Sequence, residues 1–298
     1  MTLQQLRQVL TIAESNSMNE AAKKLFVSQP NLSATVREVE EELGITVFMR
    51  NNRGITVTAE GEEFLGYAKQ VVEQYHLLEN RYLNVESKKK FSVSMQHYSF
   101  AVKAFVQLAK EVGMDEYEFA VHETKTKEVI DNVKNLKSEI GVLYLSDFNE
   151  KVLRKLFKEC DIEFKELFTC NTYVYLWKKH PLAGQKEITL DDLQEYPCLT
   201  FEQGVNNSFY YAEEMMSTYE YKRVIKADDR ATMLNLMVGL NGFTLCSGII
   251  SEDLNGDDYA AIPLKESEKM HIGYIKHKGT KLSKLGEIYI DALKNYEN

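Results

Sequence analysis

The 298-residue sequence lacks the features that mark exported, membrane-spanning and disulfide-stabilised proteins. It has four prolines and four cysteines, and no apolar run approaches the roughly 18 residues of a membrane span. The N-terminus has neither the basic segment nor the apolar stretch of a secretory signal. Cys160, Cys170, Cys198 and Cys246 contain no C-x-x-C pair, which suits buried thiols in a reducing compartment. These absences predict a cytoplasmic protein without membrane association.

Motifs for catalysis and metal binding are missing as well. The sequence contains no G-x-S-x-G, P-loop, H-E-x-x-H or G-x-G-x-x-G, and its histidines lack ligand spacing. We therefore predict no enzyme activity, no catalytic residue, no cofactor and no metal site. The length leaves room for about two domains.

A surplus of positive charge, the usual mark of a nucleic-acid-binding protein, is also absent. The net charge is −9, and the first sixty residues hold six Lys and Arg against seven Glu. Five of those six basic residues nevertheless lie close to one stretch of sequence, and these are Lys23, Lys24, Arg37, Arg50 and Arg53. If this stretch binds DNA, its non-specific affinity should be modest and steeply salt-dependent.

That stretch, Ser17–Gly44, contains signals for two short helices. Ser17, with a Glu three residues later, predicts one capped helix start, and Ser28, with Pro30 in the first turn, predicts another. Apolar residues at spacings of four, three and four then form one stripe over residues 32–43, before the terminating glycine. A helix-turn-helix from Met18 to Arg37 explains this doubled capping better than an ordinary solvated hairpin.

The second helix carries small and amide side chains opposite its apolar stripe, where they can enter a major groove and read base edges. Two β-branched runs around residues 51–54 predict a hairpin, whose arginines can contact phosphates or the minor groove. Gln29 and Ser33 are predicted to touch bases. The full set of predicted DNA-binding residues is Ser28, Gln29, Pro30, Asn31, Ser33, Ala34, Thr35, Arg37, Arg50 and Arg53.

A long helix is predicted from Thr58 to about Glu86. Its apolar residues recur at alternating spacings of four and three, a 3.5-residue period that predicts a coiled-coil seam between two copies. A dimer is what an operator of two half-sites requires. The predicted seam consists of Phe64, Ala68, Val71, Tyr75, Leu78 and Tyr82.

Beyond Phe91, short apolar runs alternate with helical patterns, which is typical of parallel sheets with crossover helices. Strands are predicted at 91–95, 118–121, 140–145, 163–168, 173–177, 198–201, 222–226, 242–246 and 270–277. Helices are predicted at 100–112, 127–136, 149–160, 207–216, 230–240 and 284–296.

The run from Ser28 to Leu65 resembles the N-terminal winged helix-turn-helix of LysR-type transcriptional regulators. The resemblance rests on Ser-Gln-Pro-Asn-Leu-Ser, on Val-Glu-Glu-Glu-Leu-Gly, and on a wing motif from Arg53 to Gly61. Ala34 departs from the family, because many members have Arg or Lys there.

The resemblance implies an α/β multi-domain protein. Residues 1–60 would form an α-rich winged helix-turn-helix domain, and residues 58–90 a linker and dimerisation helix with a hinge. Residues 91–298 would form a two-lobed effector domain of the type 2 periplasmic-binding-protein-like kind. One lobe would span about 91–165 and 268–298, and the other about 166–267.

The function implied is sequence-specific regulation of transcription, modulated by a small molecule between the lobes. The implied partners are a promoter pseudo-palindrome in double-stranded DNA, RNA polymerase, and further copies of the chain in a dimer and tetramer. The alternative is a cytoplasmic small-molecule-binding α/β protein, or an enzyme, fused to a helix-turn-helix interaction module.

Ligands of parallel sheets sit outside the carboxyl ends of strands, against helix N-termini. Residues in such loops are predicted to bind the effector, and these are Gln96, His97, Tyr98, Ser99, Glu123, Thr124, Thr126, Thr200, Phe201, Glu202, Asp229 and Ser247. Their mixture of acidic groups with Lys125 and helix N-termini suits a small polar molecule, such as an amino acid or a derivative. It is equally open that the acidic residues only cap helices or pair with Lys125 and Arg230.

Overall fold

A computed structural model describes residues 1–298 apart from 16, 52–53, 83–87, 114–115, 206–207 and 297–298. The chain forms two compact units, Met1–Ser87 and Lys88–Asn298. Among the described residues, no helix is both long and apolar enough to cross a bilayer.

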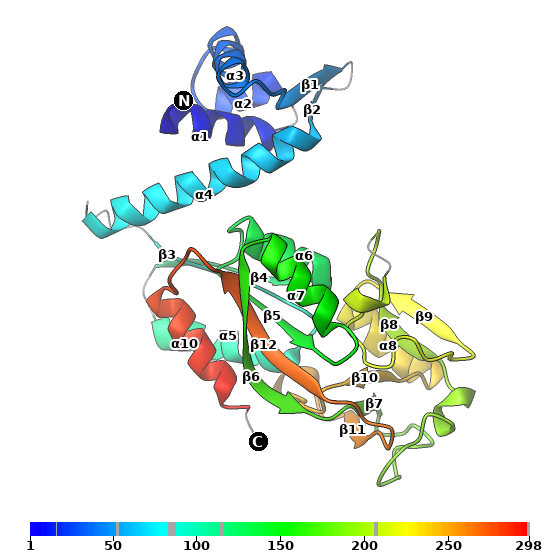
Figure 1. Cartoon of the computed structure of the whole chain (residues 1–298). Helices are drawn as coiled ribbons and strands as arrows, with labels where there is room; N and C mark the ends of the chain where they lie inside the picture. Colours follow the sequence, from blue (N-terminus) through cyan, green and yellow to red (C-terminus); the bar gives the residue numbers. More distant parts are fainter. Residues whose placement is uncertain (16, 52–53, 83–87, 114–115, 206–207, 297–298) are drawn as a thin grey trace. The chain divides into compact units, whose positions relative to one another are not determined.

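The N-terminal unit is a winged helix-turn-helix followed by a long helix (Figure 1). Its elements are α1 (Leu3–Ala13), α2 (Met18–Lys24), α3 (Gln29–Leu43), β1 (Phe48–Asn51), β2 (Gly54–Val57) and α4 (Ala59–Tyr82). The apolar faces of the first three helices meet in one core, in which Ile12, Leu32 and Val36 are buried. The amphipathic pattern of α3 therefore orients its polar face away from that core.

Capping serines begin both helices of the helix-turn-helix, as predicted. The Ser17 hydroxyl accepts a hydrogen bond from the Glu20 N–H at 3.2 Å, and the Ser28 hydroxyl accepts one from the Asn31 N–H at 3.4 Å. The Glu20 carboxylate forms an ion pair with Lys24 at 2.9 Å.

The wing is an antiparallel hairpin in which Phe48 pairs with Val57. Thr58 fixes its junction with α4, because its hydroxyl donates to the Thr46 carbonyl and accepts from the Gly61 N–H at 2.9 Å. A Cβ on Gly61 would collide with the carbonyl oxygen of Val47. The Thr-x-x-Gly spacing thus reflects this close approach of two backbones.

In the C-terminal unit, a five-stranded sheet forms the first lobe, with strand order β4-β3-β5-β12-β6. Helices α5 and α10 pack on one face of this sheet, and α6 and α7 pack on the other (Figure 1). Strand β5 is buried along its whole length, as expected for a strand covered on both faces. The elements of this lobe are β3 (Lys89–Met95), α5 (Ser99–Val112), β4 (Tyr117–Glu123), α6 (Thr126–Lys134), β5 (Ile140–Leu145), α7 (Glu150–Glu159), β6 (Ile162–Cys170), β12 (Met270–His277) and α10 (Lys284–Lys294).

The second lobe is built around β7, which pairs antiparallel with both β10 and β11. Strands β8 and β9 form a parallel pair, and a bridge between Cys198 and Phe243 joins this pair to the segment that leads into β10. Helix α8 covers these strands through Met233 and Met237. The elements of this lobe are β7 (Tyr173–Trp177), η1 (Asp192–Glu195), β8 (Cys198–Phe201), η2 (Phe209–Tyr211), β9 (Val224–Ala227), α8 (Arg230–Leu240), β10 (Thr244–Cys246), α9 (Glu252–Asn255) and β11 (Tyr259–Pro263).

The parallel sheet predicted from the alternation of strands and helices is a mixed sheet in the first lobe, where β3 runs parallel to β4 and β5. Strand β12 runs antiparallel to both β5 and β6, because the chain returns from the second lobe and enters the first sheet from the opposite direction. The proposed lobe boundary near residue 165 falls inside β6, which stays in the first sheet through Cys170.

The helix predicted over 207–216 is also wrong. The described part of this segment contains only η2, and the three consecutive residues Glu213, Glu214 and Met215 are all buried, a pattern that no surface helix gives. Strand β11 was not predicted. Its first three residues are all half-buried, so the strand lacks the alternation of buried and exposed positions by which a strand is recognised.

Candidate functional site

Helix α3 presents the predicted DNA-reading face to solvent. Pro30, Asn31, Ala34 and Arg37 are exposed, and three further polar residues, Gln29, Ser33 and Thr35, are half-buried beside them. The Gln29 amide donates to the Ser33 hydroxyl at 2.8 Å. This contact holds the amide in one orientation, which lowers the entropy lost when it binds a partner.

The wing is held to α3 by Glu40, whose side chain reaches the backbone at the start of β1. Its Oε1 accepts hydrogen bonds from the N–H of Val47 at 2.7 Å and from the N–H of Phe48 at 3.0 Å. Both of these residues are buried. Arg53 and the side chain of Arg50 lie outside the described residues.

Replacing Glu40 by Ala should destabilise the N-terminal unit by about 2 kcal/mol or more, because two buried N–H groups lose their acceptor. Urea unfolding followed by far-UV circular dichroism measures this loss. Glu40→Gln is the matched control, since its amide oxygen can still accept, and it should retain most of the stability. Equal losses in the two variants would show that the charge, not the acceptor, matters.

Part of the predicted seam on α4 is used within the chain. Ala68 is 2% exposed and packs with Leu6 of α1, and the half-buried Phe64 contacts the same cluster, so both positions have contacts within their own chain. Val71 and Leu78 are 51% and 56% exposed. Tyr75 is also exposed and lies 5.3 Å from the Arg7 guanidinium. The side chain of Tyr82 lies outside the described residues.

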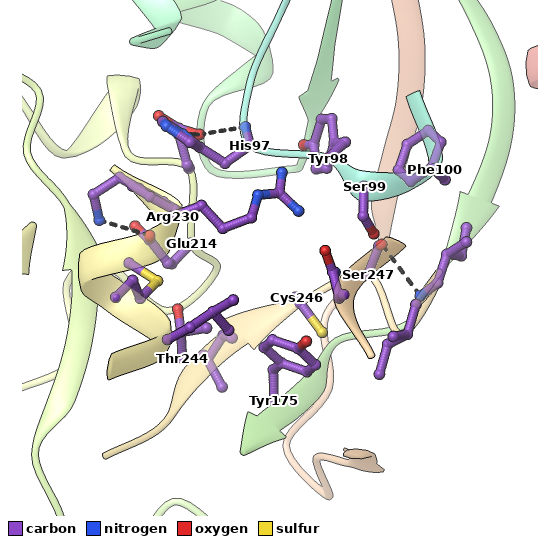
Figure 2. A pocket seen from close by; sticks show the side chains of 18 of the residues that line it. His97, Tyr98, Ser99, Phe100, Tyr175, Glu214, Arg230, Thr244, Cys246 and Ser247 are labelled. Carbon is purple, nitrogen blue, oxygen red and sulfur yellow. Dashed lines mark hydrogen bonds and ion pairs between the residues drawn. The ribbon is translucent and has the colours of Figure 1, made fainter. Parts of the chain in front are cut away.

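A pocket of about 80 Å³ lies in the C-terminal unit, between the start of α5, the start of α8 and the loop after β10 (Figure 2). Of the predicted effector-binding residues, the structure brings together five here, and these are His97, Tyr98, Ser99, Phe201 and Ser247. The lining also includes residues that were not predicted: Phe100, Tyr175, Glu213, Glu214, Arg230, Met233, Leu234, Thr244, Leu245, Cys246, Ile249, Ile250, Asn255 and Met270.

The other predicted effector-binding residues lie outside the lining, and most have structural partners. Buried Gln96 donates to Thr126 at 2.6 Å and accepts from the Tyr98 hydroxyl at 2.9 Å. Thr124 donates to Glu128. Thr200 lies in β8 and is paired there with Lys226 of β9.

The predicted acidic ligands are similarly engaged. Asp229 caps α8, where it accepts from the Thr232 N–H at 2.9 Å. Glu202 accepts from the Gly204 N–H at 3.0 Å, and Glu123 pairs with Arg230. In the structure these acids therefore cap a helix or pair with basic residues, as the second of the two alternatives predicted.

Several of these polar contacts connect the two lobes. His97, which follows β3, bonds Glu213 of the second lobe through its N–H at 2.9 Å and through Nδ1 at 2.8 Å. The Thr126 N–H donates to Gln203 at 3.1 Å, and Lys125 pairs with Asp228 at 3.3 Å. His97 also stacks on Phe201, with 3.5 Å between ring centroids.

Two adjacent carboxyl groups enter the pocket wall, and one of them is strongly perturbed. Glu214 is buried and accepts from the Phe201 N–H at 2.8 Å. Burial, with a further contribution from the charge of Glu213, raises the pKa of Glu214 to about 8. Glu213 instead accepts from His97 and Gln203. Among the described residues, no group of three or more His, Cys, Asp or Glu side chains is arranged to hold a metal ion.

A winged helix-turn-helix and a two-lobed α/β domain with a pocket are the architecture of a DNA-binding regulator. One family model, described as the bacterial regulatory helix-turn-helix protein, lysR family, matches residues 3–62, and another, described as the LysR substrate binding domain, matches residues 115–297. The chain belongs to the LysR family. It is a DNA-binding transcriptional regulator, and the predicted resemblance is confirmed.

Individual relatives agree with this assignment. The HTH-type transcriptional regulator CysL of Bacillus subtilis (strain 168) is 26% identical over 306 residues, which cover 98% of this chain and 97% of that protein. A full-length OxyR variant from Pseudomonas aeruginosa matches with a TM-score of 0.71 at 19% identity, over 99% of this chain and 95% of that chain. CbnR complexed with its target DNA matches with a TM-score of 0.60 at 17% identity, over 99% of both chains. At such identities the two structures establish the fold alone.

Proposed function

We propose that this regulator binds a promoter pseudo-palindrome as a homo-oligomer and responds to a small polar effector in the pocket between its lobes. The observation that carries the DNA-binding part is the exposed row of small and amide side chains at the start of a capped helix, beside a wing. CbnR, which has the same fold, forms a complex with its target DNA, and this supports the same use of the fold here.

Within the DNA-binding unit, Gln29 and Ser33 read base edges, while Arg37, Arg50 and Arg53 hold phosphate or the minor groove. Pro30, Asn31, Ala34 and Thr35 complete the surface that enters the groove. The exposed remainder of the seam on α4, with Val71, Tyr75 and Leu78, pairs two copies so that two reading helices face two half-sites.

Within the effector domain, ligand binding favours one arrangement of the lobes over another and so changes the spacing of paired DNA-binding units. Side-by-side pairing of effector domains builds a tetramer, and the regulator acts on RNA polymerase in the cytoplasm. No catalytic step is assigned to the pocket, in keeping with relatives that are named as transcriptional regulators.

Footprinting of the full chain on DNA upstream of its own gene tests this function. A protected pair of inverted half-sites is expected at low salt, with cell extract as the source of effector. Uniform protection, or no protection, under these conditions would overturn the assignment of a specific operator.

Gln29→Ala should cost about 1–3 kcal/mol of binding to the operator and relax the sequence preference at one base position. Arg37→Ala should instead weaken binding evenly across sequences and reduce the salt slope by about one charge. Fluorescence anisotropy on operator and scrambled DNA at several salt concentrations separates the two effects. Lys155→Ala, on the exposed surface of α7, is the matched charge control and should leave binding unchanged. Identical behaviour of the Gln29 and Arg37 variants would refute this division of roles.

A further inference from the structure

The charged groups in the pocket wall differ in whether they are free to bind a ligand. The Glu213 carboxylate is engaged by His97 and Gln203, and Glu214 accepts from a backbone N–H. Among the described lining residues, Arg230 alone carries a fixed positive charge. Its guanidinium extends into the middle of the pocket in the direction of Ser99 (Figure 2). The pocket therefore offers a positive charge to an anion, whereas its two carboxyl groups already have partners.

Arg230 is held in place by an exchangeable contact. Its Nε and Nη2 both donate to the same oxygen of Glu123, Oε1, with Nε at 3.0 Å. Within the described part of the chain, Nη1 has no hydrogen-bond partner. Because guanidinium and carboxylate groups pair best through two parallel hydrogen bonds to two oxygens, this geometry leaves donor capacity unused. The side chains are 23% and 28% exposed, so solvent further weakens the pair.

A second unused polar group lies in the same wall. Thr244 is 6% exposed, and its hydroxyl has no hydrogen-bond partner among the described residues. A buried hydroxyl without a partner is costly, and an oxygen of a ligand would remove that cost. Phe100, Leu245 and Met270 contribute apolar surface to the same lining.

The size of the pocket limits the ligand. At about 80 Å³ it is roughly half the volume of a ~150 Å³ cavity that accommodates benzene. This small volume favours a short carboxylate over a long or aromatic one, and a hydroxyl or keto oxygen on such a compound supplies the partner that Thr244 lacks.

We propose that the pocket binds a short carboxylate with a second oxygen function, whose carboxylate replaces that of Glu123 on Arg230 while its other oxygen bonds Thr244. This inference rests on the proposed role of the pocket as the effector site. Glu123 lies at the end of β4 in the first lobe and Arg230 begins α8 in the second. The ligand therefore exchanges an inter-lobe contact for one within the second lobe, which couples binding to the arrangement of the lobes.

Isothermal titration of the full chain at pH 7 with propionate, lactate, pyruvate and alanine tests the ligand class. Lactate or pyruvate should bind at least tenfold more tightly than propionate, and alanine should bind no better than propionate. Thr244→Val, which keeps the shape but removes the hydroxyl, should abolish the tenfold difference and leave propionate binding unchanged. Equal binding of the three non-amino acids, tighter binding of alanine, or no binding of any of them would overturn the ligand class.

Charge variants test the exchange at Arg230. Glu123→Gln should tighten carboxylate binding about tenfold, because the internal anion is removed, and Arg230→Gln should weaken it about a hundredfold. The matched control is Asp228→Asn, which removes the neighbouring inter-lobe pair with Lys125 outside the pocket and should change affinity less than twofold. Unchanged or weaker binding by Glu123→Gln, or equal tightening in the control, would overturn the exchange.

Footprinting with the same preparations keeps this inference separate from the proposed function. Operator protection without carboxylate binding would refute the ligand assignment and leave DNA regulation standing. Loss of both in the wild-type chain would count against the proposed function itself.

Discussion

Glu214→Gln should remove the contribution of this group to the pH dependence of the stability of the C-terminal unit between about pH 5 and 8. The pKa of Glu214 rises from its ordinary value of 4.5 to about 8, mainly because the group is buried. Between these values the native protein holds a proton that the unfolded chain has released. Stability therefore falls as pH rises, by about 1.4 kcal/mol per pH unit from this group.

The expected gain at pH 8 is on the order of 4 kcal/mol for the Gln variant, with little difference from wild type near pH 4.5. The amide can still accept from the Phe201 N–H, so the local contact survives. Trp177, the single tryptophan, lies in β7 of the same unit, and its fluorescence during urea unfolding reports the relevant transition.

Glu159→Gln, on the exposed end of α7, is the matched control and should keep the wild-type slope. Glu139, another buried carboxyl whose pKa is raised mainly by burial, gives a common background slope in all three proteins. A Gln variant of Glu214 that retains the full slope would show that Glu214 is ionised in the native protein at neutral pH.

Local sequence signals were sufficient to predict most elements of the fold. The bounds of β5, β7, β8, β12 and α8 agree with the predictions residue for residue. Each is an apolar or amphipathic run with clear polar or glycine breaks, so its limits depend on nearby residues. The position of β12 between β5 and β6 could not be predicted in this way, because strand order depends on how the chain returns from the second lobe.

The pocket lies at loops that the sequence indicated, but most of the side chains that line it were not among those predicted. His97, Ser99 and Ser247 line it because they follow strands or begin helices, which sequence can indicate. An acid such as Glu123 can face the pocket or pair with a basic residue. Which of the two occurs depends on tertiary contacts with residues that are distant in sequence. Arg230 had a local signal, since it directly follows the cap of α8, but its partner lies 107 residues earlier.

Glu213 and Glu214 were missed for a different reason. The sequence pattern places them on a solvated helix, whereas both are buried and bond groups on other elements. The two acids lie in the run Tyr-Tyr-Ala-Glu-Glu-Met-Met, with aromatic and apolar residues on both sides. This apolar surrounding was the available signal that the segment is buried.

Leu78→Asp should break the pairing along α4 that is proposed for this regulator, so that only pairing through the effector domains remains, and should reduce affinity for a two-half-site operator by about 10²- to 10⁴-fold. Leu78 is one of the three exposed apolar residues of the predicted seam on α4, with Val71 and Tyr75. Ala68, in contrast, packs in the core of its own chain. A carboxylate placed in an apolar seam is desolvated without a partner, and two-fold symmetry imposes this cost twice.

Sedimentation equilibrium of the full chain measures the oligomeric state, and fluorescence anisotropy compares operators with one and two half-sites. Leu77→Asp is the matched control, because it makes the same change at an exposed position of α4 that points away from the predicted seam, and it should leave both measurements unchanged. Binding to a single half-site should be equal in the two variants, since α3 and the wing are untouched. A Leu78→Asp variant that keeps the wild-type oligomeric state and the wild-type affinity for two half-sites would show that α4 does not pair the two DNA-binding units.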